Sequence, residues 1–166
     1  MLLDFKNEKD LSSLRKNIIK ELDENGWPTS KNESWKFTNL EFLNQLNFKV
    51  TINSNLRDRT ERIKGHNLFF SSGINANDIK EENISNLKIS NLDVESKQFR
   101  NILENLPSDH LISNLAIGYM TSCYLVEINE GAIIKEPIIL NFLDGEQNYS
   151  SHPIIFFKIN KNSQVS

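Results

Sequence analysis

The spacing of apolar residues changes from a helical to a strand-like period near Thr121, and this change constrains the fold more than any other feature. Before that point, two long segments place an apolar residue every three or four positions, as on one face of an amphipathic helix. From Tyr124 onward, apolar residues recur every second position, as in a strand. We therefore expect an α+β fold, in which residues 1–120 form a helical region with short strands and residues 121–166 form a β-rich region.

Residues 10–24 give the clearest helix prediction, because an apolar stripe is bounded by signals at both ends. Asp10 can cap the first turn, and Asn25-Gly26 supplies the left-handed residue that commonly closes a helix, with Pro28 just beyond. We expect the stripe to pack in the core; a groove-binding role is the alternative. Its residues are Leu11, Leu14, Ile18, Ile19 and Leu22.

The remainder of the helical region is less regular. The pattern predicts a loop over 51–66, a short strand over 67–70, and helices over 96–106 and 109–120. Over 78–97, the spacing of Ile and Leu residues fits short strands and loops equally well, so the pattern does not choose between them.

The β-rich region alternates short strands with polar turns. Because only some of these turns have the composition of tight hairpins, the strands can either stack as a parallel β-helix or fold back as a meander. The strands are expected over 124–128, 132–134, 137–142 and 153–159.

Two sets of residues resemble the SufB/SufD family of the SUF iron–sulfur cluster assembly scaffold, in particular the D-type subunit. Gly26-Trp27-Pro28-Thr29, followed by the segment from Glu33 to Leu40, resembles the N-terminal motif of that subunit. Phe37 departs from it, since tyrosine is common there. The matching residues of the motif are Pro28, Thr29, Glu33, Trp35, Lys36, Phe37, Thr38 and Leu40, while Asn114, Ala116, Gly131 and Pro137 resemble the entry to the family's β-helix.

The resemblance implies a non-catalytic scaffold that pairs with a B-type subunit and docks an ABC-type ATPase. It also implies a helical region followed by the first strands of a right-handed parallel β-helix. In that family the subunit contacts, the ATPase-docking region and a candidate cluster-related histidine lie toward the C-terminal side, so we assign no catalytic, cofactor-binding or metal-binding residue. Because the sequence ends at Ser166, where a further strand is expected, we expect the chain to be an N-terminal fragment that can self-associate through its last strands.

Composition and charge argue against several classes of partner. The net charge is −3, and acidic and basic residues are scattered along the chain, so no basic stripe indicates nucleic-acid binding. No apolar run approaches the ~18 residues that a membrane-spanning helix needs. The N-terminus lacks the apolar core of a signal peptide, and the single cysteine suits a reducing compartment, so we expect a cytoplasmic location.

The candidate metal-binding and catalytic residues do not form a motif. Cys123 is the only cysteine, and His66, His110 and His152 lie far apart in sequence, which argues against a metal site or a bound cofactor. We expect Cys123 to be a small buried side chain. No phosphate-binding loop, nucleophile elbow or zinc-protease motif occurs, so we expect no enzymatic activity. The alternative to the scaffold is a free-standing β-rich interaction module unrelated to iron–sulfur chemistry.

Overall fold

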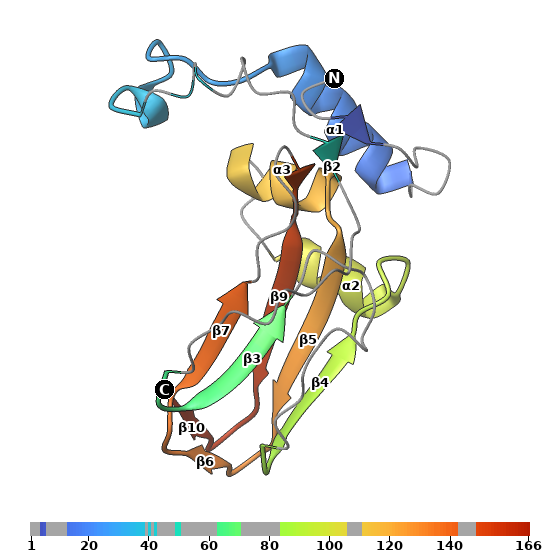
Figure 1. Cartoon of the computed structure of the whole chain (residues 1–166). Helices are drawn as coiled ribbons and strands as arrows, with labels where there is room; N and C mark the ends of the chain where they lie inside the picture. The colour runs from blue at the N-terminus through green and yellow to red at the C-terminus, as the bar shows by residue number, and fades with distance from the viewer. Residues whose placement is uncertain are drawn as a thin grey trace.

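The computed structural model describes residues 4–5, 13–38, 40, 42, 49–50, 63–70, 84–105, 111–142 and 149–166. These residues form a mixed α+β structure (Figure 1). The helices are α1 (Ser13–Asn25), the 3₁₀ helix η2 (Glu33–Trp35), α2 (Lys97–Leu103) and α3 (Leu111–Gly118). The strands are β1 (Asp4–Phe5), β2 (Lys49–Val50), β3 (His66–Phe70), β4 (Leu87–Asn91), β5 (Ser122–Ile128), β6 (Ile133–Ile134), β7 (Ile138–Phe142), β8 (Tyr149–Ser150), β9 (Pro153–Ile159) and β10 (Gln164–Val165).

Helix α1 confirms the first helix prediction, and its C-terminal signal acts as expected. Gly26 has a φ of 66° and its N–H donates to the carbonyl oxygen of Leu22 at 2.9 Å, which closes the helix. The expected cap at Asp10 lies outside the described residues. The prediction of core packing was wrong for Leu14. Its side chain is 40% exposed, because the helix turns the face of Ile19 and Leu22 toward the core.

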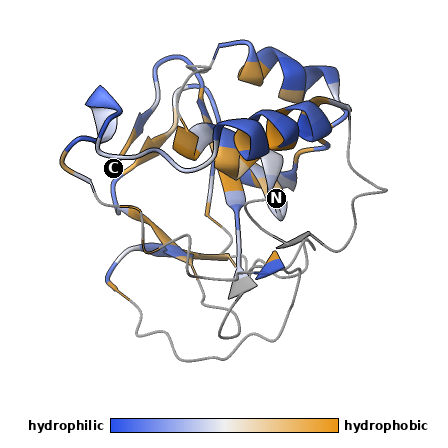
Figure 2. Cartoon of the chain, turned by 90° about the horizontal axis from the view of Figure 1, so that it is seen from above, coloured by the Kyte–Doolittle hydropathy of each residue, from blue (hydrophilic) through white to orange (hydrophobic). Residues whose placement is uncertain are grey.

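Helices α1 and α3 pack on each other at the upper end of the molecule (Figure 1). Their buried cluster holds Ile19 and Leu22 from α1, Leu115 from α3, and Val50 and Tyr119. Gly118 allows the close approach, since a Cβ there would lie 3.2 Å from side-chain atoms of Ile18 and Ile19. Seen from above, the helices carry both hydrophilic and hydrophobic positions, as amphipathic helices do (Figure 2).

The strands of the β-rich region lie side by side along the length of the molecule (Figure 1). Strands β5 and β9 pair in parallel along seven residues, from Ser122 opposite Pro153 to Ile128 opposite Ile159. Strands β6 and β10 are also parallel, with Ile133 opposite Gln164. In both pairs the partner lies 31 residues further along the chain.

Four other pairings complete the sheets of the described residues. Strand β3 is parallel to β7, with His66 opposite Ile138. Strand β2 lies between β1 and β8 and is parallel to both. Strand β4 pairs with β5 and is antiparallel to it, which settles part of the segment that the sequence pattern left open.

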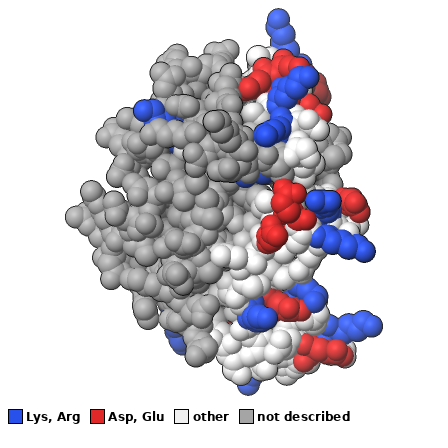
Figure 3. All heavy atoms as spheres, turned by 90° about the vertical axis from the view of Figure 1, so that its right-hand side faces the viewer, with Lys and Arg blue, Asp and Glu red and all other residues white. Residues whose placement is uncertain are grey.

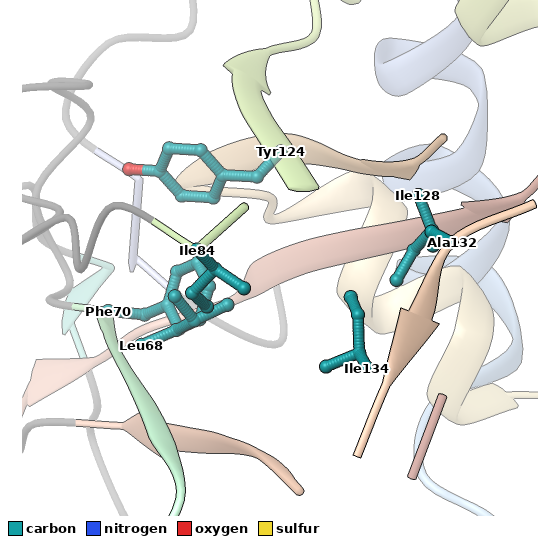
Figure 4. Packing of buried hydrophobic residues seen from close by; sticks show 7 residues of the cluster. All are labelled: Leu68, Phe70, Ile84, Tyr124, Ile128, Ala132 and Ile134. Atoms are coloured by element: carbon teal, nitrogen blue, oxygen red, sulfur yellow. The ribbon is translucent and has the colours of Figure 1, made fainter. Parts of the chain in front are cut away.

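The main apolar core lies between the β3–β7 sheet and the β4–β5–β9 sheet. Figure 4 shows seven of its side chains in the space between the strands: Leu68, Phe70, Ile84, Tyr124, Ile128, Ala132 and Ile134. A second cluster lies under α2, where Phe99 packs with Cys123 and Leu125 of β5. Side chains alternate along a strand, so β5 contributes to both clusters.

Candidate interaction site at the tryptophan connector

The segment after α1, which we call the connector (residues 26–38 and Leu40), is ordered by local hydrogen bonds. The Asn32 Oδ1 atom accepts from the backbone N–H of Thr29 at 2.9 Å, and the Asn32 N–H donates back to the Thr29 carbonyl at 2.9 Å. The next turn is the 3₁₀ helix, which begins with the Trp35 N–H donating to the Asn32 carbonyl at 2.9 Å. Short-range bonds of this kind hold the connector in a defined shape without a regular helix or strand.

A first hollow, of about 340 Å³, lies between α1, the connector and α3. Pro28, Trp35 and Asn114 all line it, although Asn114 is far from the other two in sequence. Trp35 is half-buried, and not the fully buried anchor that core packing would require. The structure therefore brings together residues from both parts of the family-like pattern.

A second hollow, of about 210 Å³, also has Pro28 in its lining and is built from residues of the connector. Its lining residues are Pro28, Thr29, Ser30, Lys36, Phe37, Thr38 and Leu40. The Phe37 side chain is 95% exposed, and the Lys36 ammonium lies 5.6 Å from the centre of its ring. An exposed aromatic ring beside a cation is a chemistry that suits contact with another protein.

Glu33 belongs to the connector and is the first residue of its 3₁₀ helix. Three other residues of the family-like pattern, Ala116, Gly131 and Pro137, lie outside the connector. Ala116 is half-buried on α3. Gly131 has a φ of 71° in the turn after β5, and its N–H donates to the Lys161 carbonyl at 3.0 Å. The Pro137 carbonyl accepts from the His66 N–H at 2.8 Å, which joins the starts of β3 and β7.

Cys123 is buried and His152 is partly buried, and both lie in surroundings that disfavour their charged forms. Burial raises the pKa of the Cys123 thiol to about 12, which suits the expected role as a buried side chain. Burial lowers the pKa of His152 to about 4. Its Nε2 atom lies 3.2 Å from the Ser150 Oγ atom, and its ring lies 6.0 Å from that of Tyr119.

The described residues contain no group of three or more His, Cys, Asp or Glu side chains that could hold a metal ion. His110 lies outside these residues. Within the same ranges, no helix is long and apolar enough to cross a membrane. On the face shown in Figure 3, lysine and arginine side chains alternate with aspartate and glutamate, so neither sign of charge dominates its described part.

Sequence reasoning did not single out Arg15. It is buried, and its guanidinium donates to the carbonyl oxygens of Gly118 at 3.2 Å and Met120 at 2.8 Å. The signal was present in the spacing, because Arg15 lies four and seven positions before Ile19 and Leu22 and therefore shares their face.

Comparison with known proteins does not assign the chain to a family. No protein-family model matches the sequence, and no curated protein matches it. The resemblance of the connector to the SufB/SufD family therefore stays a prediction.

Proposed function

We propose that the chain is the N-terminal portion of a non-catalytic scaffold subunit for iron–sulfur cluster assembly in the SUF system. In this proposal it acts in the cytoplasm, as part of a full-length subunit that contacts a B-type subunit and an ABC-type ATPase. Residues 1–120 form its helical region, and residues 121–166 are the first coils of a right-handed parallel β-helix.

The observation that carries the proposal is the 31-residue shift that two parallel pairs, β5–β9 and β6–β10, share. The parallel pair β3–β7 has a longer shift, from His66 to Ile138. Stacked coils of a parallel β-helix place each strand beside the corresponding strand of the next coil, so neighbouring strands of one coil share the same shift to their partners. The β5–β9 and β6–β10 pairs have this relationship. The apolar cluster between β3–β7 and β4–β5–β9 occupies the position that the interior of such a coil would have.

The connector gives separate support, because residues that the family pattern shares converge in space. Pro28, Trp35 and Asn114 line one hollow. The buried thiol of Cys123 is poorly suited to a cluster ligand, which is consistent with support through protein contacts.

A chimera tests the proposal. Residues 1–166 would replace the N-terminal portion of a known D-type subunit, and the chimera would be expressed in cells that lack that subunit. We expect it to co-purify with the B-type subunit and the ATPase and to restore the activity of an iron–sulfur enzyme. A chimera that is folded by circular dichroism and yet captures neither partner would favour the free-standing interaction module.

A further inference from the structure

Both tryptophans of the chain line the first hollow, which lies between α1, the connector and α3. Trp27 and Trp35 are each partly buried, so the fold holds both without closing them off from the surface. Trp27 also packs against the buried cluster that joins α1 to α3. Two indole rings at one hollow offer faces on which a cationic group can stack. The other lining residues are Glu21, Leu22, Asn25, Gly26, Pro28, Asn32, Leu111 and Asn114.

The charge of the hollow is negative, because Glu21 is the only ionisable residue in its lining. Asn25 and Gly26 place the hollow beside the end of α1, where main-chain carbonyl groups carry a partial negative charge. No basic residue offsets this charge in the last turn of α1. The first turn of α3 borders the hollow through Leu111 and has the opposite partial charge, so the two helix ends balance and the full charge of Glu21 remains. The hollow therefore favours a cation.

The Glu21 carboxylate is available to such a cation. Its side chain is exposed, and it forms no ion pair or hydrogen bond with other residues that the structure describes. The lysine that precedes it, Lys20, pairs instead with Glu24 at 3.8 Å. Glu24 does not line the hollow.

A guanidinium group fits this combination better than an ammonium group does. It is planar, so it stacks on an indole ring, and its five N–H donors can reach a carboxylate and amide oxygens together. Asn25 and Asn114 line the hollow and can supply such oxygens. The volume of about 340 Å³ is at the lower end of the range for small-molecule sites, and it suits one long side chain.

We propose that the first hollow binds an arginine side chain of a partner protein, which stacks on a tryptophan ring and pairs with Glu21. Tryptophan and arginine are both enriched among the residues that dominate the binding energy of interfaces. Phe37, which is 95% exposed in the same connector, offers a second contact that a partner protein can use and a free amino acid cannot. The inference does not depend on the proposed function, since it would hold equally for a free-standing interaction module.

Tryptophan fluorescence tests the proposal, because Trp27 and Trp35 are the only tryptophans of the chain. The probe is the peptide acetyl-Gly-Arg-Gly amide, and its control carries citrulline, which is uncharged and nearly isosteric, in place of arginine. At constant ionic strength, we expect a saturable change in emission with a Kd in roughly the millimolar range. The citrulline peptide should bind at least roughly threefold more weakly. A change that does not saturate, or equal binding of the two peptides, would overturn the proposal.

Two variants of α1 separate contact at the hollow from overall charge. Glu21→Gln removes the carboxylate that lines the hollow, whereas Glu24→Gln removes the same charge at a position that does not. We expect Glu21→Gln to weaken binding of the arginine peptide by roughly threefold to fivefold and Glu24→Gln by less than about twofold. Circular dichroism should show that both variants are folded, since both side chains are exposed. Equal weakening would mean that only net charge acts, and would refute the contact with Glu21.

Two further ligands identify the occupant. Free L-arginine should bind no more tightly than the blocked peptide, and the corresponding lysine peptide should bind at least roughly twofold more weakly than the arginine peptide. Clearly tighter binding of free L-arginine would indicate a site for the amino acid and refute a partner protein. Equal binding of the lysine and arginine peptides would refute the assignment of arginine.

Discussion

The guanidinium of Arg15 donates to the main-chain carbonyl oxygen of Met120 at 2.8 Å, across 105 residues of sequence. Its Nε atom also donates to the Gly118 carbonyl at the end of α3. A helix ends with carbonyl groups that lack a partner within the helix, and a cation there is favourable. Arg15 therefore fastens α1 to the point where α3 ends and the β-rich region begins.

Replacing Arg15 should destabilise this junction. Arg15→Met keeps much of the apolar stem and leaves buried carbonyl oxygens without their donors, so we expect a loss of about 2 to 4 kcal/mol in the free energy of unfolding. Urea denaturation followed by circular dichroism measures it. Lys20→Met on the same helix is the control: its ion pair with Glu24 is exposed, so the change should stay within about 0.5 kcal/mol. Equal effects at the two positions would contradict the role given to Arg15.

Among the glycines that the structure describes, Gly65 is the one where an added side chain would meet the closest contact. Its φ is 140°, and a Cβ there would lie 2.6 Å from the Pro137 carbonyl oxygen, which already accepts from His66. We expect Gly65→Ala to cost about 3 kcal/mol or more, since steric overlap adds to backbone strain. The measurement is the shift in urea midpoint at constant slope.

Gly131→Ala is the matched control for Gly65→Ala. Gly131 also has a positive φ, of 71°, but a Cβ at this residue would meet no other atom within 4 Å, so strain alone should cost about 1 to 2 kcal/mol. If Gly65→Ala were no worse than Gly131→Ala, the close approach of Gly65 to Pro137 would be wrong.

Local signals predicted most elements, because they act over a few residues. The end of α1 at Gly26 and the strands β5, β6, β7 and β9 follow from turn residues and the period of apolar side chains. The antiparallel pairing of β4 with β5 did not follow, since a strand's period does not reveal its partner. Register between distant strands depends on packing of the whole sheet.

The candidate site was predictable only in its parts. The motif residues of the connector could be named from the sequence, whereas the placement of Trp35 and Asn114 around one hollow depends on how α3 packs against α1. Arg15 was hidden because an arginine on an amphipathic helix is usually exposed, and only tertiary contacts show that carbonyl groups surround it.

Cys123 should be chemically inert in the folded chain. Its thiol is buried and its pKa is raised to about 12, so almost no thiolate exists at neutral pH to bind iron or to react. We expect anaerobic reconstitution with iron and sulfide to leave the purified chain colourless, and Cys123→Ser to leave its fold unchanged. Stoichiometric cluster absorbance that disappears in Cys123→Ser would contradict both the inert thiol and the proposal that this portion of the scaffold holds no cofactor.

His152 should make the fold sensitive to mild acid. Burial lowers the pKa of His152 from 6.5 to about 4, so the unfolded chain binds a proton at this residue more readily than the folded chain. Its stabilising effect is therefore fully present above pH 6.5 and declines as the pH falls toward 4, by on the order of 3 kcal/mol in total. Urea denaturation at a series of pH values measures this.

Because carboxylates such as Glu127 also gain protons near the acid end, the comparison must include His152→Gln, which cannot titrate. We expect the variant to lose the decline between pH 6.5 and about 5 and to keep the steeper loss at lower pH. Identical pH profiles for His152→Gln and wild type would show that the imidazole is not held neutral against Tyr119 and Ser150.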